Sequence, residues 1–242
     1  MPPDRAPAAQ PAVGQPAGDV LAAVLWDLDG TLVDTEHYWW DAEKELVAAY
    51  GGHWTDADAQ TLVGSALLDS AAVMRKRVGL PLSEPEIVQR MLAAVIRRVR
   101  EHLPFRAGVP ELLAQLRTQA VPMALVTMSW TVLADAVLEA LPGGTFEVVV
   151  TGDQVTNGKP HPEPYLTAAR RLGVPIESCV AIEDSTNGMV SAHSAGARTL
   201  LVPNVVAPDP LPGVALLPTL AGVTPAELLR VTGRAAAGAI RS

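Results

Sequence analysis

The sequence has little cysteine, few basic residues and no long apolar run. Its single cysteine, Cys179, excludes an intrachain disulfide, and the apolar segment around it predicts a buried, unreactive thiol. No apolar run approaches the roughly 20 residues that span a bilayer. Lysine and arginine number 18 against 26 acidic residues, a net charge of -8 that disfavours nucleic acid as a partner. We therefore expect a cytoplasmic protein that binds neither nucleic acid nor membrane.

What is present predicts a globular protein. The chain has 242 residues, of which 49% are apolar, which is ample for a large hydrophobic core. The segment 1–19 differs from the rest because it is rich in Pro, Ala, Gly and Gln and lacks the apolar middle of a signal peptide. We predict a disordered tail there.

Apolar segments alternate with helical patterns along most of the chain. The expected strands are 20–26, 123–127, 146–151, 179–182 and 199–202. The expected helices between and after them are 109–119, 131–141, 162–172 and 187–195. Continuous apolar runs are typical of strands that are buried on both faces. This alternation predicts an α/β fold with a doubly wound parallel sheet of the Rossmann-like kind.

The stretch 35–104 interrupts that alternation with helical segments only. Within it, Ser83 and Glu86 have the spacing of a capping box that opens a helix. Thr224 and Glu227 repeat this spacing before a C-terminal helix. Before this C-terminal helix, the proline-rich segment 203–218 predicts a loop with one edge strand. We expect a core domain made of 20–34 and 105–242, with a helical domain, 35–104, inserted after the first strand.

Two carboxylates follow the first predicted strand. Asp27 and Asp29 lie at its carboxyl end, where open α/β sheets bind ligands, and their spacing of two places both side chains on one side of an extended chain. Gly30 then allows a sharp turn. One carboxylate of such a pair can attack phosphorus while the other moves protons to and from the leaving oxygen. The alternative is a polar turn without function.

Further chemistry-bearing residues follow later strands. Thr127 ends the second strand, where its hydroxyl and nearby amides can hold a phosphoryl oxygen. Lys159 lies between a glycine and a proline near a helix start, a suitable place to offset phosphate charge. Glu183 and Asp184 end another strand and are oxygen ligands of the kind that Mg²⁺ prefers. Each signal alone also fits solvated surface, but their order favours one site.

These segments resemble the four motifs of the haloacid dehalogenase-like superfamily, and closest to them is the subgroup of β-phosphoglucomutase and phosphoglycolate phosphatase. The matching residues are Asp27-Leu28-Asp29-Gly30-Thr31-Leu32, Thr127, Gly158-Lys159-Pro160 and Glu183-Asp184-Ser185 with Gly188. The resemblance covers nearly all of the chain after Asp19. It implies that the helical insert is a small α-helical cap that closes over the site.

The resemblance also implies a role for each matching residue. Asp27 would be the nucleophile that forms a phosphoaspartate, and Asp29 the general acid and base. Thr127 and Lys159 would bind the transferring phosphoryl group, with Met128 and Trp39 beside the substrate. The implied cofactor is Mg²⁺, and its ligands would be Asp27, Asp29 through its carbonyl, Asp184 and Glu183. Family dehalogenases lack an aspartate at the position of Asp29, so its presence favours phosphate chemistry.

Three functions remain open. A phosphatase of a small phosphorylated metabolite is favoured over a β-phosphoglucomutase-like mutase. The reason is that Trp39 and Leu67 stand where that mutase has a histidine and a phosphate-binding arginine. Cap arginines at 75, 77, 97 or 98 could still bind a second phosphate, although solvated faces are the simpler interpretation. A catalytically silent binding protein is the third alternative.

The sequence leaves the substrate open. Tyr38, Trp39 and Trp40 form the one aromatic cluster of the chain, and they either line a substrate pocket or pack the cap onto the core. We expect a monomer or a weak dimer.

Overall fold

The computed structural model describes residues 21–239, with side chains through Gly233, so the predicted tail 1–19 lies outside the described residues. Its centre is one parallel sheet with the strand order β3-β2-β1-β4-β5-β6. The strands are β1 Ala23–Trp26, β2 Met123–Val126, β3 Val148–Val150, β4 Cys179–Glu183, β5 Arg198–Leu201 and β6 Ala215–Leu216. The predicted doubly wound α/β fold is therefore confirmed, and β6 is the edge strand expected within 203–218.

Side chains of each central strand alternate between two apolar cores. In β1, Val24 and Trp26 face the core shared with α5 (Val109–Thr118), α6 (Thr131–Leu138) and α9 (Pro225–Ala239). Ala23 and Leu25 face the other core, with α7 (Glu163–Leu172) and α8 (Thr186–Ala195). Because both faces are covered, the central strands are entirely buried. Short 3-10 turns, η1 Gly152–Gln154 and η2 Ile176–Ser178, complete the connections.

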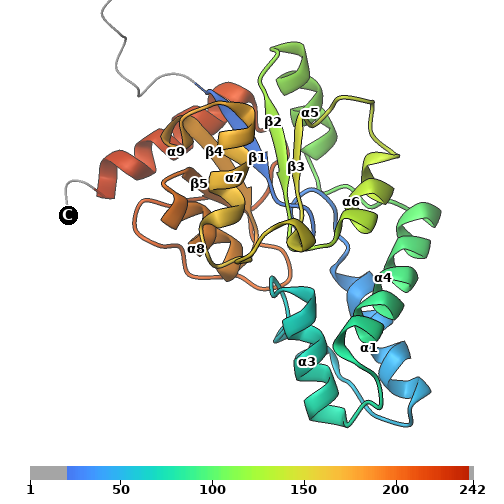
Figure 1. The fold of residues 1–242 in the computed structure, drawn as a ribbon. Coiled ribbons are helices and arrows are strands. Elements are labelled where there is room, and N and C mark those ends of the chain that lie inside the picture. Colours follow the sequence, from blue (N-terminus) through green and yellow to red (C-terminus); the bar gives the residue numbers. More distant parts are fainter. Residues whose placement is uncertain (1–20, 240–242) are drawn as a thin grey trace, which may run out of the picture.

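Four helices lie between β1 and α5, where the sequence predicts only helices. They are α1 Glu36–Ala49, α2 Asp56–Gln60, α3 Leu67–Val78 and α4 Glu84–Glu101. The two chain segments that connect them to the sheet run side by side: Val33 forms an antiparallel bridge with Phe105, and the Asp34 N–H donates to the Pro104 carbonyl at 2.7 Å. Figure 1 shows this helical module beyond the carboxyl ends of the strands. We propose that this helical module, 35–104, is a cap domain.

The helix starts follow the expected chemistry. Glu86 accepts hydrogen bonds from the backbone and the hydroxyl of Ser83 at the start of α4, at 2.8 and 2.7 Å. Thr224 accepts from the Glu227 N–H at 3.2 Å at the start of α9. Such caps satisfy N–H groups that have no partner within the helix. Among the helices described between residues 21 and 239, none is long and apolar enough to span a membrane.

Candidate active site

The motif residues meet at the carboxyl edge of the sheet. β1 is flanked by β2 and β4, so the residues that end these three strands are neighbours in space although they lie far apart in sequence. Asp27 follows β1, Thr127 follows β2, and Glu183 ends β4. The topology therefore places the predicted site residues together at the position where parallel sheets bind ligands.

Lys159 lies at the centre of this group. Its Nζ donates to Asp27 Oδ1 at 2.7 Å, to Glu183 Oε1 at 2.6 Å and to the Val126 carbonyl at 2.9 Å. The hydroxyl of Tyr165, on α7, also donates to Glu183 Oε1. All of these side chains are buried, so their charges are weakly screened by water. Lys159 is thus fixed beside the Asp27 carboxylate.

Asp27, Glu183 and Asp184 form a buried acidic cluster whose carboxylate oxygens lie within 4.8 Å of one another. Burial, and next the charge of Glu183, raise the pKa of Asp27 to about 7, although Lys159 opposes the shift. Burial, and then the charges of Asp27 and Glu183, raise the pKa of Asp184. Asp27 Oδ2 and Glu183 Oε2 are buried without a hydrogen-bond partner among the described residues. A bound cation would compensate this excess of negative charge.

Gly30 brings the Asp27–Thr31 turn against this cluster. Its φ is +82°, a conformation that L residues rarely adopt, and an added Cβ would lie 2.0 Å from Asp184 Oδ2. The guanidinium of Arg106 donates to the Gly30 carbonyl at 2.6 Å and to the Pro203 carbonyl at 3.0 Å. Only glycine fits this position, as the sharp turn expected from the sequence requires.

The Asp29 carboxylate is directed toward the helical module. Oδ1 accepts from the Thr35 hydroxyl at 2.6 Å and from the Trp39 indole N–H at 2.9 Å. Oδ2 accepts from the Ser129 hydroxyl at 2.6 Å. Three donors therefore hold one carboxylate, and they come from the start of α1 and from the loop after β2. The Asp29 carboxylate therefore connects the sheet side of the site to the helical module.

A pocket lies between the sheet and the helical module. Its sheet side is lined by Asp27, Asp29, Thr127, Met128, Ser129, Lys159, Asp184 and Ser185. Its helical side is lined by Glu36, Trp39, Trp40, Glu43, Ala59, Leu62, Val63, Gly64, Ser65, Leu67, Ser70 and Met91. Both positions that separate this chain from the mutase, Trp39 and Leu67, thus lie on the pocket wall, and the predicted pocket residues Thr127 and Met128 lie opposite them.

Thr127 and Met128 make contacts that shape the sheet side. The Thr127 hydroxyl oxygen accepts from the Ser129 N–H at 3.0 Å. Met128 Sδ accepts from the Lys159 N–H at 3.1 Å, and it lies so near Gly158 that an added Cβ there would be 2.7 Å away. Met128 therefore packs under the segment that carries Lys159 as well as lining the pocket.

The members of the aromatic cluster have different surroundings, and the Tyr38 hydrogen bond lies within the helical module rather than between it and the core domain. Trp39 and Trp40 line the pocket, whereas the Tyr38 hydroxyl donates to the His102 carbonyl at 3.0 Å and ties α1 to the end of α4. A further contact joins the helical module to the sheet: Asn187 Nδ2, on α8, donates to the Gly64 carbonyl at 3.1 Å. The pocket is therefore bounded by contacts on both sides.

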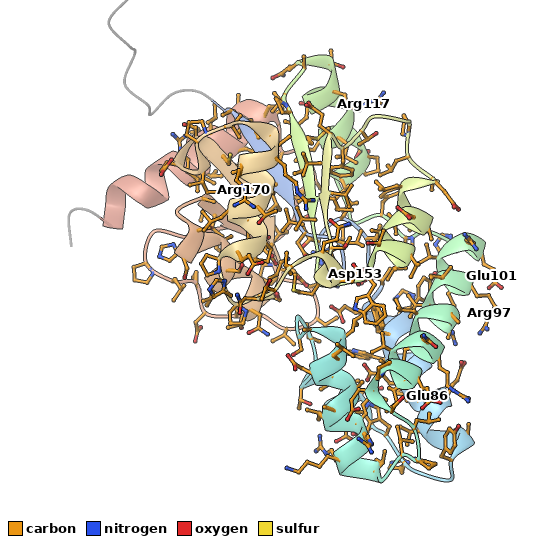
Figure 2. All side chains as sticks on the ribbon, in the orientation of Figure 1. Glu86, Arg97, Glu101, Arg117, Asp153 and Arg170 are labelled. Atoms are coloured by element: carbon orange, nitrogen blue, oxygen red, sulfur yellow. The ribbon has the colours of Figure 1, made fainter. Side chains whose placement is uncertain are left out.

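The arginines of the helical module lie outside the pocket. Arg75 pairs with Glu84, Arg77 with Asp58 and Arg98 with Glu45. Arg97 is exposed on α4, on the side turned away from the sheet, as Figure 2 shows. Arg75, Arg77 and Arg97 agree with the solvated faces that the sequence indicates. The Arg98 side chain is only 15% exposed and also donates to the Ala94 carbonyl.

Several residues that line the pocket or support its side chains were not singled out from the sequence. Thr35 and Ser129 contact Asp29, Tyr165 contacts Glu183, and Glu36 and Glu43 line the helical side. The sequence does contain a pattern that indicates Glu36 and Glu43. Positions 36, 39 and 43 fall on one face of a helix, so two acids share the buried face of α1 with Trp39. Burial, followed by the charges of Asp29 and Asp27, raises the pKa of Glu36 to about 8. Burial raises the pKa of Glu43 to about 7.

Comparison with known proteins identifies the family. The family model of haloacid dehalogenase-like hydrolases matches residues 24–202. Protein CbbY of Rhodobacter capsulatus is 33% identical over 195 residues, covering 76% of this chain and 86% of CbbY. Hexitol phosphatase B of Escherichia coli K12 is 31% identical over 190 residues, covering 76% and 84%.

A solved structure shows the same fold. It is a mutant form of CbbY from Rhodobacter sphaeroides in complex with xylulose-(1,5)bisphosphate. It superposes with a TM-score of 0.80 at 28% identity, over 86% of this chain and 99% of that one. The chain therefore belongs to the haloacid dehalogenase-like hydrolase family, as its four motifs predict.

Proposed function

We propose that this chain is a magnesium-dependent phosphatase that hydrolyses a small phosphate monoester through a phosphoaspartate at Asp27. The observation that carries the proposal is the pair of carboxylates in one pocket. Asp27 is held at 2.7 Å by Lys159, and Asp29 is held by three donors from both sides. The named relatives support it, because hexitol phosphatase B is a phosphatase of the same family.

The described residues fit a magnesium ion. Hard oxygen ligands are what Mg²⁺ prefers, and Asp27 and Asp184 supply them with an excess of buried negative charge that a cation would offset. The Asp29 carbonyl is the third candidate ligand. Glu183 is committed to Lys159 and Tyr165 through Oε1, so we assign it a supporting role beside the ion. When bound, Mg²⁺ would neutralise phosphoryl charge in the transition state.

The protein groups can carry both halves of the hydrolysis. An Asp27 carboxylate oxygen forms a bond to phosphorus while the bond from phosphorus to the alcohol oxygen breaks. Asp29 gives the departing oxygen its proton. In the second half, Asp29 takes a proton from water, whose oxygen attacks phosphorus and releases the Asp27 carboxylate with inorganic phosphate. Lys159 offsets charge on the phosphoryl oxygens, and the Thr127 region holds them in place.

The pocket favours hydrolysis over phosphoryl transfer between two positions of a sugar. A mutase must hold a phosphate at each end of its substrate, and the helical side of the pocket has no cation for the distal one among its described residues. A silent binding protein is disfavoured because every catalytic position carries a suitable residue. A phosphorylated sugar or sugar alcohol is the substrate class that the named relatives suggest.

Phosphate release from a broad panel of phosphate esters, with and without Mg²⁺, tests the proposal. We expect Mg²⁺-dependent release from at least one ester and a loss of more than about 1000-fold in Asp27→Asn, which keeps the side-chain shape but removes the nucleophile. The matched control is Asp153→Asn, because Asp153 accepts a hydrogen bond from the Thr131 N–H at the start of α6 and does not line the pocket. Full activity in Asp27→Asn, or no release from any ester, would reject the proposal.

A further inference from the structure

The helical wall of the pocket carries two buried carboxylates. Glu36 and Glu43 are 7% and 5% exposed, and both line the pocket from α1. Glu43 Oε2 accepts from the Trp54 indole N–H at 2.8 Å. The Glu36 carboxylate has no such donor among the described residues; its Oε1 is exposed to the pocket near the turn at Gly30, beside Asp184. Carboxylates buried this deeply are costly unless something donates to them. Glu36 therefore presents unused acceptors to whatever enters the pocket.

Positive charge is missing from the same wall. Of the described residues that line the pocket, Lys159 is the one lysine or arginine, and three acceptors on the sheet side already surround its ammonium group. Three cations of α1 and α3 are committed elsewhere, with Lys44 paired to Asp56, Arg75 to Glu84 and Arg77 to Asp58. The remaining one, Lys76, is exposed and does not line the pocket. At pH 8, above the raised pKa of about 7 of Glu43, a second anionic group on a substrate would find no cation on this wall and would meet the Glu43 carboxylate, with Glu36 beside it.

We propose that the alcohol part of the substrate carries no anionic group, and that Glu36 and Glu43 select against a carboxylate or a second phosphate. The inference rests on the proposed phosphatase function and defines its substrate class: monophosphates whose alcohol part is uncharged and rich in hydroxyl groups. Hydroxyl groups donate to carboxylates, so they satisfy the acceptors that Glu36 offers. Trp39 and Trp40 supply apolar surface for the carbon chain between these contacts. Like charges brought together in a buried site disfavour the wrong substrate.

Matched pairs of substrates test this selection, because each pair differs only in one terminal group. The pairs are 2-hydroxyethyl phosphate with phosphoglycolate, glycerol 3-phosphate with 3-phosphoglycerate, and glucitol 6-phosphate with 6-phosphogluconate. In each pair a CH2OH group is replaced by a carboxylate. At pH 8 with Mg²⁺, we expect kcat/KM for the alcohol to exceed that for the acid at least tenfold in the pair that the enzyme hydrolyses best. Equal values within threefold would overturn the inference.

Substitutions in α1 test whether Glu43 causes the preference for alcohols over acids. Glu43→Gln removes one charge and keeps an oxygen that can accept the Trp54 hydrogen bond. Glu43→Gln should lower the ratio of kcat/KM for the alcohol to kcat/KM for the acid at least threefold, mainly because KM for the acid falls. The control Glu45→Gln changes net charge equally on the same helix, but Glu45 is exposed and pairs with Arg98 outside the pocket. It should keep the wild-type ratio. An unchanged ratio in Glu43→Gln, or equal narrowing in the control, would reject the role of Glu43.

Loss of the proposed function and loss of the proposed selection give different results. If no member of any pair and no other ester releases phosphate, the proposed function is wrong. If esters are hydrolysed but the acids are processed as well as the alcohols, the phosphatase stands and the selection by Glu36 and Glu43 is wrong. Near-ultraviolet circular dichroism of both variants checks that the fold is retained.

Discussion

The indole N–H of Trp39 donates to Oδ1 of Asp29 at 2.9 Å, and this bond joins the helical module to the carboxylate that we propose as the acid and base. The donor lies on α1 and the acceptor lies in the turn after β1. The position of the proposed acid and base therefore depends on where the helical module sits.

Trp39→Phe removes this donor and keeps most of the ring. Because a hydrogen bond to a charged group contributes about 1.5–3 kcal/mol, we expect kcat to fall roughly 10- to 100-fold while KM changes little. The control is Trp40→Phe, since the Trp40 indole nitrogen is buried without a partner in the described part of the chain and its loss should cost much less. Equal losses of kcat in the two variants would show that the Trp39 bond is unimportant.

Removing Lys159 should destabilise the protein in a pH-dependent way. Lys159→Met leaves Asp27 and Glu183 buried without their cation, so we expect a loss of about 3–5 kcal/mol in the free energy of unfolding at pH 8. The pKa of Asp27 is already raised to about 7, so at pH 5 its carboxyl takes up a proton and part of the loss disappears.

Urea unfolding of wild type and Lys159→Met without metal measures this difference. Lys44→Met serves as the control, because Lys44 pairs with Asp56 at the surface and its loss should have little effect at either pH. A destabilisation of Lys159→Met that is larger at pH 5 than at pH 8 would contradict the charge argument.

Magnesium should stabilise the folded protein through the acidic cluster. At Mg²⁺ about 100-fold above its Kd, binding to the folded state contributes about 2.7 kcal/mol, so we expect the Tm to rise by about 5–10 °C. Asp184→Asn should lose most of this shift, because Asp184 is one of the three clustered carboxylates. Thermal melts with and without Mg²⁺ measure the effect, and a full shift in Asp184→Asn would remove this residue from the metal site.

Glu43 should make stability depend on pH. Burial raises its pKa from 4.5 to about 7, so the folded state holds the proton more tightly than the unfolded state does. The stability of the wild type should therefore fall as pH rises through the window from 4.5 to 7. Glu43→Gln lacks this contribution and should be more stable than the wild type by about 1–3 kcal/mol at pH 8, with little difference at pH 4.5. Denaturant unfolding at the two pH values checks the sign, and a variant less stable than wild type at pH 8 would oppose it.

The site residues that the sequence predicts are those whose positions depend on the local sequence. Asp27 and Asp184 could be placed because each follows a buried apolar run, and parallel strands bring such positions to one edge. The strand at 146–151 is shorter in the structure, as β3 Val148–Val150, because it is an edge strand that pairs only with β2.

The contacts that were missed depend on long-range packing. Ser129 reaches Asp29 across 100 residues. Tyr165 reaches Glu183 from α7, a helix that packs on β3, β2 and β1. No local pattern specifies either approach. The acids of α1 were accessible in principle, since Glu36 and Glu43 repeat on its buried face, but their orientation toward the pocket follows from the angle between α1 and the sheet.

The formation of phosphoaspartate at Asp27 is the central claim, and chemical trapping tests it most directly. Wild type and Asp29→Asn are mixed with a hydrolysed ester and Mg²⁺, quenched in acid and treated with borohydride, which reduces an acyl phosphate to the alcohol. Peptide mass spectrometry should then find homoserine at position 27. With an ester whose leaving group needs no proton, such as p-nitrophenyl phosphate, Asp29→Asn should hold more of it because water is no longer activated. Phosphate release without any homoserine at position 27, or homoserine at position 29 of the wild type, would contradict the account.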